Sequence, residues 1–176
     1  MKSNSTALIT VDCIIDKETF IDFSKFHRFY AQRNSWNIII FPVVLLGFAI
    51  INWCIGNNTF GWILLALSVI LPVGSLTAFY LRTYKQVEVF KLNTPRVFYS
   101  LSFHEERIQI SNKKEKVDYE WSKVYKIYRT KCSIYLYITP MNAFIIPSDS
   151  IKDYTIDDLW TLFQKHLIDK KLIFKK

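Results

Sequence analysis

Residues 36–81 read WNIIIFPVVLLGFAIINWCIGNNTFGWILLALSVILPVGSLTAFYL, and this stretch contains no Asp, Glu, Lys, Arg or His. It holds two apolar runs, 36–55 and 62–81, separated by a short uncharged turn. About 20 residues of helix cross a hydrocarbon core of about 30 Å. Two buried helices of a soluble protein are the alternative, but such helices usually carry a polar stripe, which neither run has. The stretch therefore predicts a two-helix transmembrane hairpin.

The residues at the ends of the two runs indicate how the hairpin is oriented. Trp36, Trp53, Trp62 and Tyr80 fall at the four ends, and such rings prefer the headgroup level of a bilayer. The turn has no Lys or Arg, whereas basic residues flank the hairpin on both outer sides. Because positively charged flanks stay in the cytoplasm, we expect both termini there and the turn outside. The flanking residues are Lys25, Arg28, Arg33, Arg82, Lys85 and Lys91.

The second run contains a proline and two small residues that bear on its packing. Pro72 predicts a kink, because proline removes a backbone donor from the helix. Gly74 and Ala78 allow another helix to approach closely. Packing of the two runs against each other is the preferred interpretation, and dimerisation is the alternative. Because no ionisable group lies within the hairpin, nothing indicates a proton relay or a charged pore.

The composition narrows the classes of function. The chain has a formal net charge of +8, and most of the excess follows residue 81. This charge suits an anionic inner leaflet better than nucleic acid once a membrane hairpin is present, so we expect no nucleic-acid partner. All four glycines lie in the hairpin, which excludes glycine-rich phosphate loops and nucleophile elbows elsewhere. The three cysteines form no CxxC motif, and a reducing compartment disfavours a disulfide.

The residues before the hairpin contain a short strand and a helix. Residues 7–15 alternate between apolar and polar side chains, with Val11 and Cys13 on the apolar face. A lone strand is unstable in water, so we expect these two residues to pair with an edge strand of the C-terminal sheet. From Lys17 to about Arg33, aromatic residues recur at helical spacing and predict an amphipathic helix at the membrane surface or leading into the first span.

The residues after the hairpin change to a period of two and predict about six short antiparallel strands. Thr155 and Asp158 resemble a capping box, which begins a helix whose apolar face would seal the open end of a curved sheet. Trp121 at the end of a strand and Trp160 on the helix face should both be buried. The four expected regions are 1–35, 36–81, 82–96 and 97–176.

Two stretches in this last region carry a family resemblance. YEWSKV at 119–124 and NAFIIP at 142–147, placed after an apolar hairpin and before a helix, resemble the YcxB-like family of bacterial membrane proteins. The resemblance implies a cytoplasmic domain similar to a pleckstrin-homology or GRAM-type barrel, in a multi-pass protein of the bacterial plasma membrane. The expected fold is thus a membrane α-helical hairpin plus a small antiparallel β domain, a PH/GRAM-like barrel or curved sheet, sealed by a C-terminal helix. The family carries no established activity, so it supplies no catalytic residues.

The side chains that could carry chemistry do not form a recognisable catalytic or metal-binding pattern. His104-Glu105-Glu106 lacks a second His at helical spacing and is interpreted as a turn. Cys132 could pair with His104 or His166 as a nucleophile, but a small core residue is the preferred interpretation. The many tyrosines are interpreted as cross-strand packing, with an aromatic ligand groove as the alternative. We therefore predict no catalytic residue, no metal site and no cofactor.

The C-terminal segment is the one candidate site. It interleaves basic and apolar residues, namely Lys165, Lys170, Lys171, Leu172, Ile173, Phe174, Lys175 and Lys176. Such a segment suits a membrane surface, with the lysines at anionic headgroups and the apolar side chains dipping inward. Packing of 172–174 against the domain is the alternative interpretation.

Two functions from different classes are consistent with these patterns. The first is a membrane-tethered, non-catalytic binding or regulatory module whose β domain recognises a protein segment or a lipid headgroup. The second is a membrane enzyme acting on a lipid-linked substrate, and a small transport subunit is a weaker third. The sequence favours the first, because it shows no paired carboxylates, activated nucleophile or metal-ligand spacing. The expected partners are the lipid bilayer, anionic headgroups, and a protein partner or second copy.

Overall fold

The computed structural model describes residues 7–31, 37–112, 115–168 and 171–174. Its contacts divide the chain into two compact units. The described residues up to Phe23, together with those from Lys91 onward, form one unit, which we call the β domain. Ser24 to Phe90 form the other, which we call the helical unit. The β domain is therefore discontinuous in sequence.

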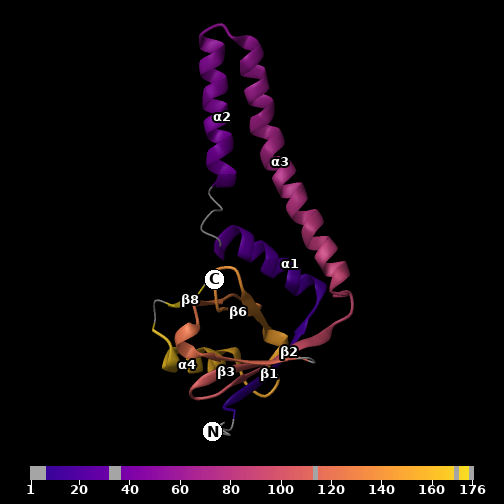
Figure 1. Cartoon of the computed structure of the whole chain (residues 1–176), viewed down its shortest axis with the longest axis vertical. Helices are drawn as coiled ribbons and strands as arrows, with labels where there is room; N and C mark the ends of the chain where they lie inside the picture. Colours follow the sequence, from indigo (N-terminus) through magenta and orange to yellow (C-terminus); the bar gives the residue numbers. More distant parts are fainter. Residues whose placement is uncertain (1–6, 32–36, 113–114, 169–170, 175–176) are drawn as a thin grey trace. The chain divides into compact units, whose positions relative to one another are not determined.

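Eight strands and one further helix make up most of the β domain (Figure 1). Six of the strands, β2 to β7, lie between Arg96 and Pro147, in agreement with the predicted number. Short 3-10 turns follow β4 at Trp121–Lys123 and β7 at Ser148–Ser150. The bounds are β1 (Ile9–Ile15), β2 (Arg96–Phe103), β3 (Arg107–Ser111), β4 (Lys116–Glu120), β5 (Lys126–Arg129), β6 (Ser133–Tyr137), β7 (Ala143–Pro147), α4 (Ile156–His166) and β8 (Leu172–Phe174).

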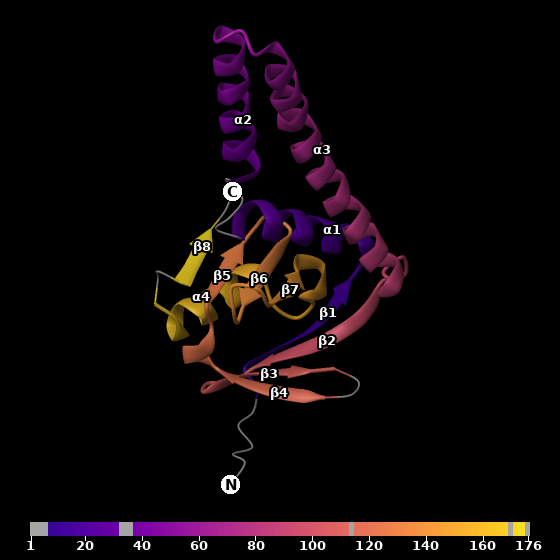
Figure 2. The ribbon, with the colours of Figure 1, turned by 45° about the horizontal axis from the view of Figure 1, so that its top comes forward.

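The strands form two sheets of four. The first has the order β1-β2-β3-β4 and is antiparallel throughout, and the second has the order β7-β6-β5-β8 (Figure 2). The second sheet is antiparallel except that β8 pairs with β5 in parallel. The sequence predicted either a barrel or a curved sheet, and the described strands do not form a closed barrel.

The pairing predicted for the N-terminal strand is confirmed. β1 adds to the edge of the first sheet, where Val11 lies opposite Leu101 and Cys13 lies opposite Tyr99. Alternate side chains of β1 are buried, as expected for a strand with one face on a core. A bulge between Cys13 and Ile14 shifts the register near the end of the strand. A strand that precedes the helical unit in sequence thus completes a sheet whose other three strands follow that unit.

Both sheets and α4 share one hydrophobic core. Leu101, Ile127, Leu136 and Phe163 are fully buried in it and come from four different elements. Trp121 is 6% exposed, so its predicted burial is confirmed. The prediction for Trp160 is wrong in part, because this residue is only partly buried against the core. The guanidinium carbon of Arg129 lies 5.9 Å from the centroid of the Trp160 ring.

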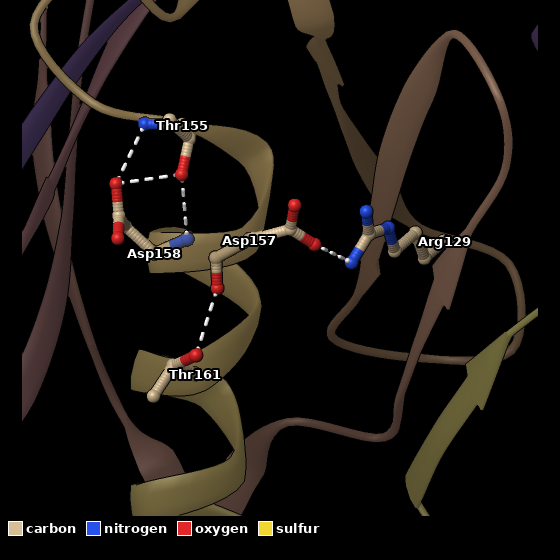
Figure 3. A network of polar contacts seen from close by, with 5 residues as sticks. All are labelled: Arg129, Thr155, Asp157, Asp158 and Thr161. Carbon is tan, nitrogen blue, oxygen red and sulfur yellow. Dashed lines mark hydrogen bonds and ion pairs between the residues drawn. The ribbon is translucent and has the colours of Figure 1, made fainter.

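The helix α4 begins with the capping box that the sequence predicts (Figure 3). The Thr155 hydroxyl oxygen accepts the backbone N–H of Asp158 at 3.1 Å, and the Asp158 carboxylate accepts the Thr155 N–H at 2.9 Å. These hydrogen bonds satisfy backbone donors that the first helical turn would otherwise leave unpaired. The Thr155 hydroxyl also donates to the Asp158 carboxylate at 2.6 Å, and this bond, together with the one from the Thr155 N–H, holds the pKa of Asp158 below its ordinary value.

The helical unit contains two long apolar helices joined by a short turn. They are α2 (Asn37–Cys54) and α3 (Asn58–Val89), and they pack along each other (Figure 1). The expected turn is longer than the observed one, in which Gly56 has a positive φ of 80°. The second apolar run ends at Leu81, and α3 continues past it to Val89 as one helix. It also continues through Pro72, so any kink there does not interrupt it.

A third helix crosses from the β domain into the helical unit. This helix, α1 (Lys17–Phe26), is followed by a π-helical turn at His27–Ala31, and the two cover most of the predicted amphipathic helix. The Phe29 ring of the turn packs edge-on against Phe79 of α3, with centroids 5.8 Å apart. Residues 32–36, which include the predicted start of the first run at Trp36, lie outside the described residues.

Among the described helices, α3 is the one that is long and apolar enough to cross a membrane by length and composition. Its most apolar 18-residue window has a mean hydropathy of 2.1, and 6% of this window is buried within the structure. The stretch Ile38–Cys54 is a shorter apolar helix. By length and composition, α3 is thus the one described helix that could cross a membrane, and the two-span hairpin belongs to the functional proposal below.

Candidate functional site

The β domain contains a cavity of about 310 Å³ between the start of β2, the end of β3 and β7. Small-molecule sites range from roughly 300 to 1,000 Å³, so this volume is at the lower end of that range. Of the lining residues, Arg96 alone is charged, and most of the others are apolar or aromatic. The lining residues are Arg96, Val97, Phe98, Tyr99, Ile110, Asn112 and Phe144.

Tyr99 shapes one wall of the cavity and joins the two sheets. Its hydroxyl donates to the carbonyl of Ile145 at 2.9 Å and accepts the N–H of the same residue at 2.6 Å. Ile145 belongs to β7, which is an edge strand, so the hydroxyl occupies backbone groups that this edge would otherwise expose. Burial raises the pKa of Tyr99 well above its ordinary value. The phenol is therefore a neutral structural link, with both of its hydrogen-bonding functions in use.

Phe144 of β7 lines the cavity beside Tyr99. Its ring packs edge-on against Tyr99, with centroids 5.4 Å apart, and is tilted against Tyr119 at 6.3 Å. Arg96 begins β2, and its guanidinium carbon lies 5.1 Å from the centroid of Phe98. This distance is typical of a cation–π contact, which holds the charge beside the apolar wall. The cavity thus has a cation at its rim and aromatic rings along its sides.

A second cluster of polar and aromatic groups surrounds Trp121. The Trp121 indole N–H donates to the carbonyl of His104 at 3.0 Å, and the His166 ring stacks on the indole with centroids 4.6 Å apart. Lys165 forms an ion pair of 2.7 Å with Glu105, whose second carboxylate oxygen lies 4.0 Å from His166 Nε2. The hydrogen bond from Lys165 lowers the pKa of Glu105. These contacts join α4 to the turn between β2 and β3, so the cluster is a clamp within the fold.

The tyrosines of the second sheet pack against neighbouring rings. Tyr135 and Tyr137 are buried, and Phe23 of α1 packs edge-on against Tyr135 with centroids 5.2 Å apart. Tyr128 packs edge-on against Tyr137 at 5.5 Å. Burial raises the pKa of Tyr137 and raises that of Tyr135 to about 12. Cross-strand packing therefore accounts for these rings, and the aromatic-groove alternative is reduced to Tyr99 beside the cavity.

The cysteines differ from expectation in one case. Cys132 is exposed in the turn between β5 and β6, so its interpretation as a small core residue is wrong. Cys13 is the cysteine that is buried, and burial raises the pKa of its thiol. Among the described residues, no three His, Cys, Asp or Glu side chains gather closely enough to hold a metal ion.

The described residues of the C-terminal segment are placed within the β domain. Leu172, Ile173 and Phe174 form β8, in which Leu172 packs against the core and Phe174 is 55% exposed. Lys165 pairs with Glu105, and the Lys171 ammonium donates to the carbonyl of Ser122 at 3.1 Å. This placement favours packing against the domain for Leu172. Of the other predicted surface residues, Lys170, Lys175 and Lys176 lie outside the described residues.

Sequence reasoning did not identify the cavity. Its lining joins β2 and the end of β3 to β7, which begins more than thirty residues later, and no local pattern distinguishes Arg96 or Phe144 from other residues of their strands. The break at residues 93–95 is the one signal nearby, since it places Arg96 at the start of a strand. The register of the sheets then brings the remaining residues to it.

The comparison with known families supports the resemblance noted above. Residues 103–165 match the model of a family described as YcxB-like protein. The matched segment runs from the end of β2 into α4 and contains both stretches that carry the resemblance, 119–124 and 142–147. It leaves α2 and α3 outside the match. No curated protein and no solved structure matched the chain.

Proposed function

We propose that the chain is a membrane-tethered, non-catalytic binding or regulatory module. The two helices of the helical unit anchor it as a multi-pass hairpin in a bacterial plasma membrane, with both termini in the cytoplasm. The β domain, a YcxB-like domain with an open counterpart of the PH/GRAM architecture, recognises its ligand on the cytoplasmic side. The ligand is a lipid headgroup or a protein segment, and the cavity beside Arg96 is the recognition site.

The observation that carries the proposal is the apolar surface of α2 and α3. Large apolar side chains are exposed all along both helices, for example Phe41 at 53%, Ile51 at 56% and Ile70 at 62%. Contiguous apolar surface of this extent is rare on a soluble monomer, because water disfavours it. A hydrocarbon environment removes that cost, and neither helix carries a charged residue between Asn37 and Leu81.

The polar side chains within these helices suit the same environment. The hydroxyls of Ser68, Ser75 and Thr77 donate to backbone carbonyls three or four residues earlier, at 2.7–2.9 Å. The amide of Asn52 donates to the carbonyl of Phe48 at 2.9 Å. A polar group in hydrocarbon costs several kcal/mol unless it is hydrogen-bonded, so local bonds of this kind are needed there.

Binding is favoured over catalysis by the chemistry of the cavity. Its polar groups are a guanidinium, a side-chain amide and a phenol whose hydroxyl is engaged with backbone. A guanidinium recognises an anion but does not exchange its proton near neutral pH. The lining thus supplies recognition groups and apolar surface, whereas a general base or an activated nucleophile is what an enzyme would need.

Mild extraction and purification test this proposal. The full chain should sediment with membranes, resist extraction at alkaline pH and require detergent for release. A stoichiometric protein or a bound lipid in the purified material would support a binding module. Turnover of a lipid-linked substrate by the purified chain would instead support the membrane enzyme. Release by alkaline wash without detergent would contradict the tether.

A further inference from the structure

The strand β4 forms one edge of the first sheet and, among the described strands, pairs with β3 alone (Figure 2). We propose that its outer edge is a dimer interface, at which β4 pairs antiparallel with β4 of a second copy of the chain. The twofold axis passes through Asp118, so that Lys116 of each copy lies opposite Glu120 of the other. This assignment goes beyond the binding role proposed above, because it adds a second surface and names its partner.

The other edges of the two sheets are each irregular, covered or short. Along β1, a bulge follows Cys13, and the Ile14 N–H donates to the Ser150 hydroxyl at 2.9 Å. At β7, the Tyr99 hydroxyl bonds to both backbone groups of Ile145, and β8 has only three residues. Such features keep a sheet edge from pairing with another chain. In contrast, β4 keeps a regular register with β3 over all five of its residues.

The hairpin that joins β3 to β4 determines which backbone groups of β4 point outward. The Asn112 N–H donates to the Glu115 carbonyl at 2.9 Å and closes the hairpin. Hydrogen-bonded and non-hydrogen-bonded pairs alternate along an antiparallel ladder, so the bonds to β3 come from Val117 and Tyr119. A second strand would satisfy the backbone groups of the residues that point to the open side. These residues are Lys116, Asp118 and Glu120.

The sequence of β4, KVDYE, is complementary to itself when two copies run antiparallel about Asp118. Lys116 then lies opposite Glu120 of the second copy, and the same pair of opposite charges repeats on the other side of the axis. On the other face of the sheet, Val117 lies opposite Tyr119 of the second copy. Val117 is 41% exposed, so the second strand would cover an apolar side chain that β3 leaves open to water.

The two Asp118 side chains meet at the axis, and their charge is offset within each chain. Arg107 Nη1 lies 3.5 Å from the Asp118 carboxylate, and the Gln109 amide donates to it at 2.8 Å. Both partners belong to β3, so they hold the carboxylate away from the axis. An axis at Val117 would instead place Glu120 opposite the hairpin tip and leave part of β4 without a strand partner.

Disulfide cross-linking of the full chain, purified in mild detergent, tests this register. Cys54 and Cys132 are exposed and are replaced by Ala, whereas the buried Cys13 stays. In the proposed pairing the two Asp118 Cα atoms lie about 5.5 Å apart, within the range that a disulfide spans. Asp118→Cys should therefore give an oxidised dimer. Val117→Cys lies about 7–8 Å from its counterpart on the diagonal and should give at least about fivefold less dimer.

Charge reversal tests the complementarity, with the cross-linking yield of Asp118→Cys as the measured quantity. Lys116→Glu places like charges opposite each other on both sides of the axis and should lower the yield at least about fivefold. Glu120→Lys should do the same, and the chain with both changes should regain most of the yield. This rescue requires a second copy, because within one chain both positions lie opposite β3 and not each other. Lys152→Glu reverses an exposed charge outside β4 and should leave the yield unchanged.

Circular dichroism of each variant checks that the fold is kept, and the double reversal remains decisive where a single reversal lowers stability. The proposal is overturned if Asp118→Cys gives no oxidised dimer, which would leave the edge of β4 to a strand of another protein. It is also overturned if Val117→Cys gives an equal yield or if the double reversal restores nothing. A dimer that survives both single reversals but is lost in Gly74→Ile would assign self-association to α3 instead.

Discussion

Replacing Tyr99 by Phe removes the one hydroxyl that bonds to both backbone groups of Ile145 across the two sheets. The ring would keep its contact with Phe144, so the change isolates the hydrogen bonds from the packing. A buried backbone group left unpaired costs about 1–3 kcal/mol. Tyr99 is partly buried against the core, and we expect the loss of its hydroxyl to cost about 1–3 kcal/mol in total.

A loss of this size is measurable in the unfolding temperature of the β domain. One kcal/mol lowers the midpoint by about 4–8 °C in a domain of roughly 100 residues, so Tyr99→Phe should lower it by roughly 4–24 °C. Hydrogen-exchange mass spectrometry should show faster exchange in the peptide that contains β7. The control is Tyr119→Phe, whose ring packs on the same Phe144. An unchanged midpoint together with unchanged exchange in β7 would refute the role given to the Tyr99 hydroxyl.

Three further changes test other parts of the structure. Gly61→Ala places a Cβ against the indole of Trp53 and should shift tryptophan fluorescence and lower the stability of the helical unit, whereas Gly47→Ala, which has open space, should do neither. Arg129→Gln removes the cation–π contacts with Trp160 and Phe174 and should lower the free energy of unfolding, measured with denaturant, by about 1 kcal/mol. Asp157→Asn removes only the exposed ion-pair partner of Arg129 and should lower it by less than about 0.5 kcal/mol (Figure 3). Equal losses in the two variants would contradict this difference between the contacts. The pKa of Tyr135 is raised from 10.0 to about 12, so between these pH values the folded chain keeps a proton that the unfolded chain releases. The free energy of unfolding should therefore fall as the pH rises from 10 towards 12, and it should fall less in Tyr135→Phe. A steeper fall in the variant would contradict this pH dependence.

The features that local chemistry determines could be predicted from the sequence. The alternation of residues 7–15 is sufficient to define one buried face, and that face requires a partner sheet, which β2 supplies. Thr155 and Asp158 have the spacing of a capping box, whose hydrogen bonds form within a single turn. The burial of Trp121 followed in the same way from its place at the end of an alternating strand.

The features that depend on tertiary contacts could not be predicted in this way. β8 has three residues, too few to show a period, and its partner β5 lies more than forty residues earlier. The apolar run ends at Leu81, where charges begin, but charged residues do not end a helix, and α3 continues to Val89, close to the breaker Asn93-Thr94-Pro95. The partial exposure of Trp160 and the lining of the cavity depend on side chains brought together from separate strands.

The central claim is that α2 and α3 form a membrane hairpin that holds the β domain in the cytoplasm. Single-cysteine labelling in intact cells tests it most directly, using a background without Cys13, Cys54 and Cys132 and a membrane-impermeant maleimide. A cysteine introduced at Asn57, in the turn between the helices, should be labelled from outside, whereas one at Lys152 of the β domain should be labelled only after the cells are opened. Labelling of both positions in intact cells, or of Lys152 alone, would contradict the account.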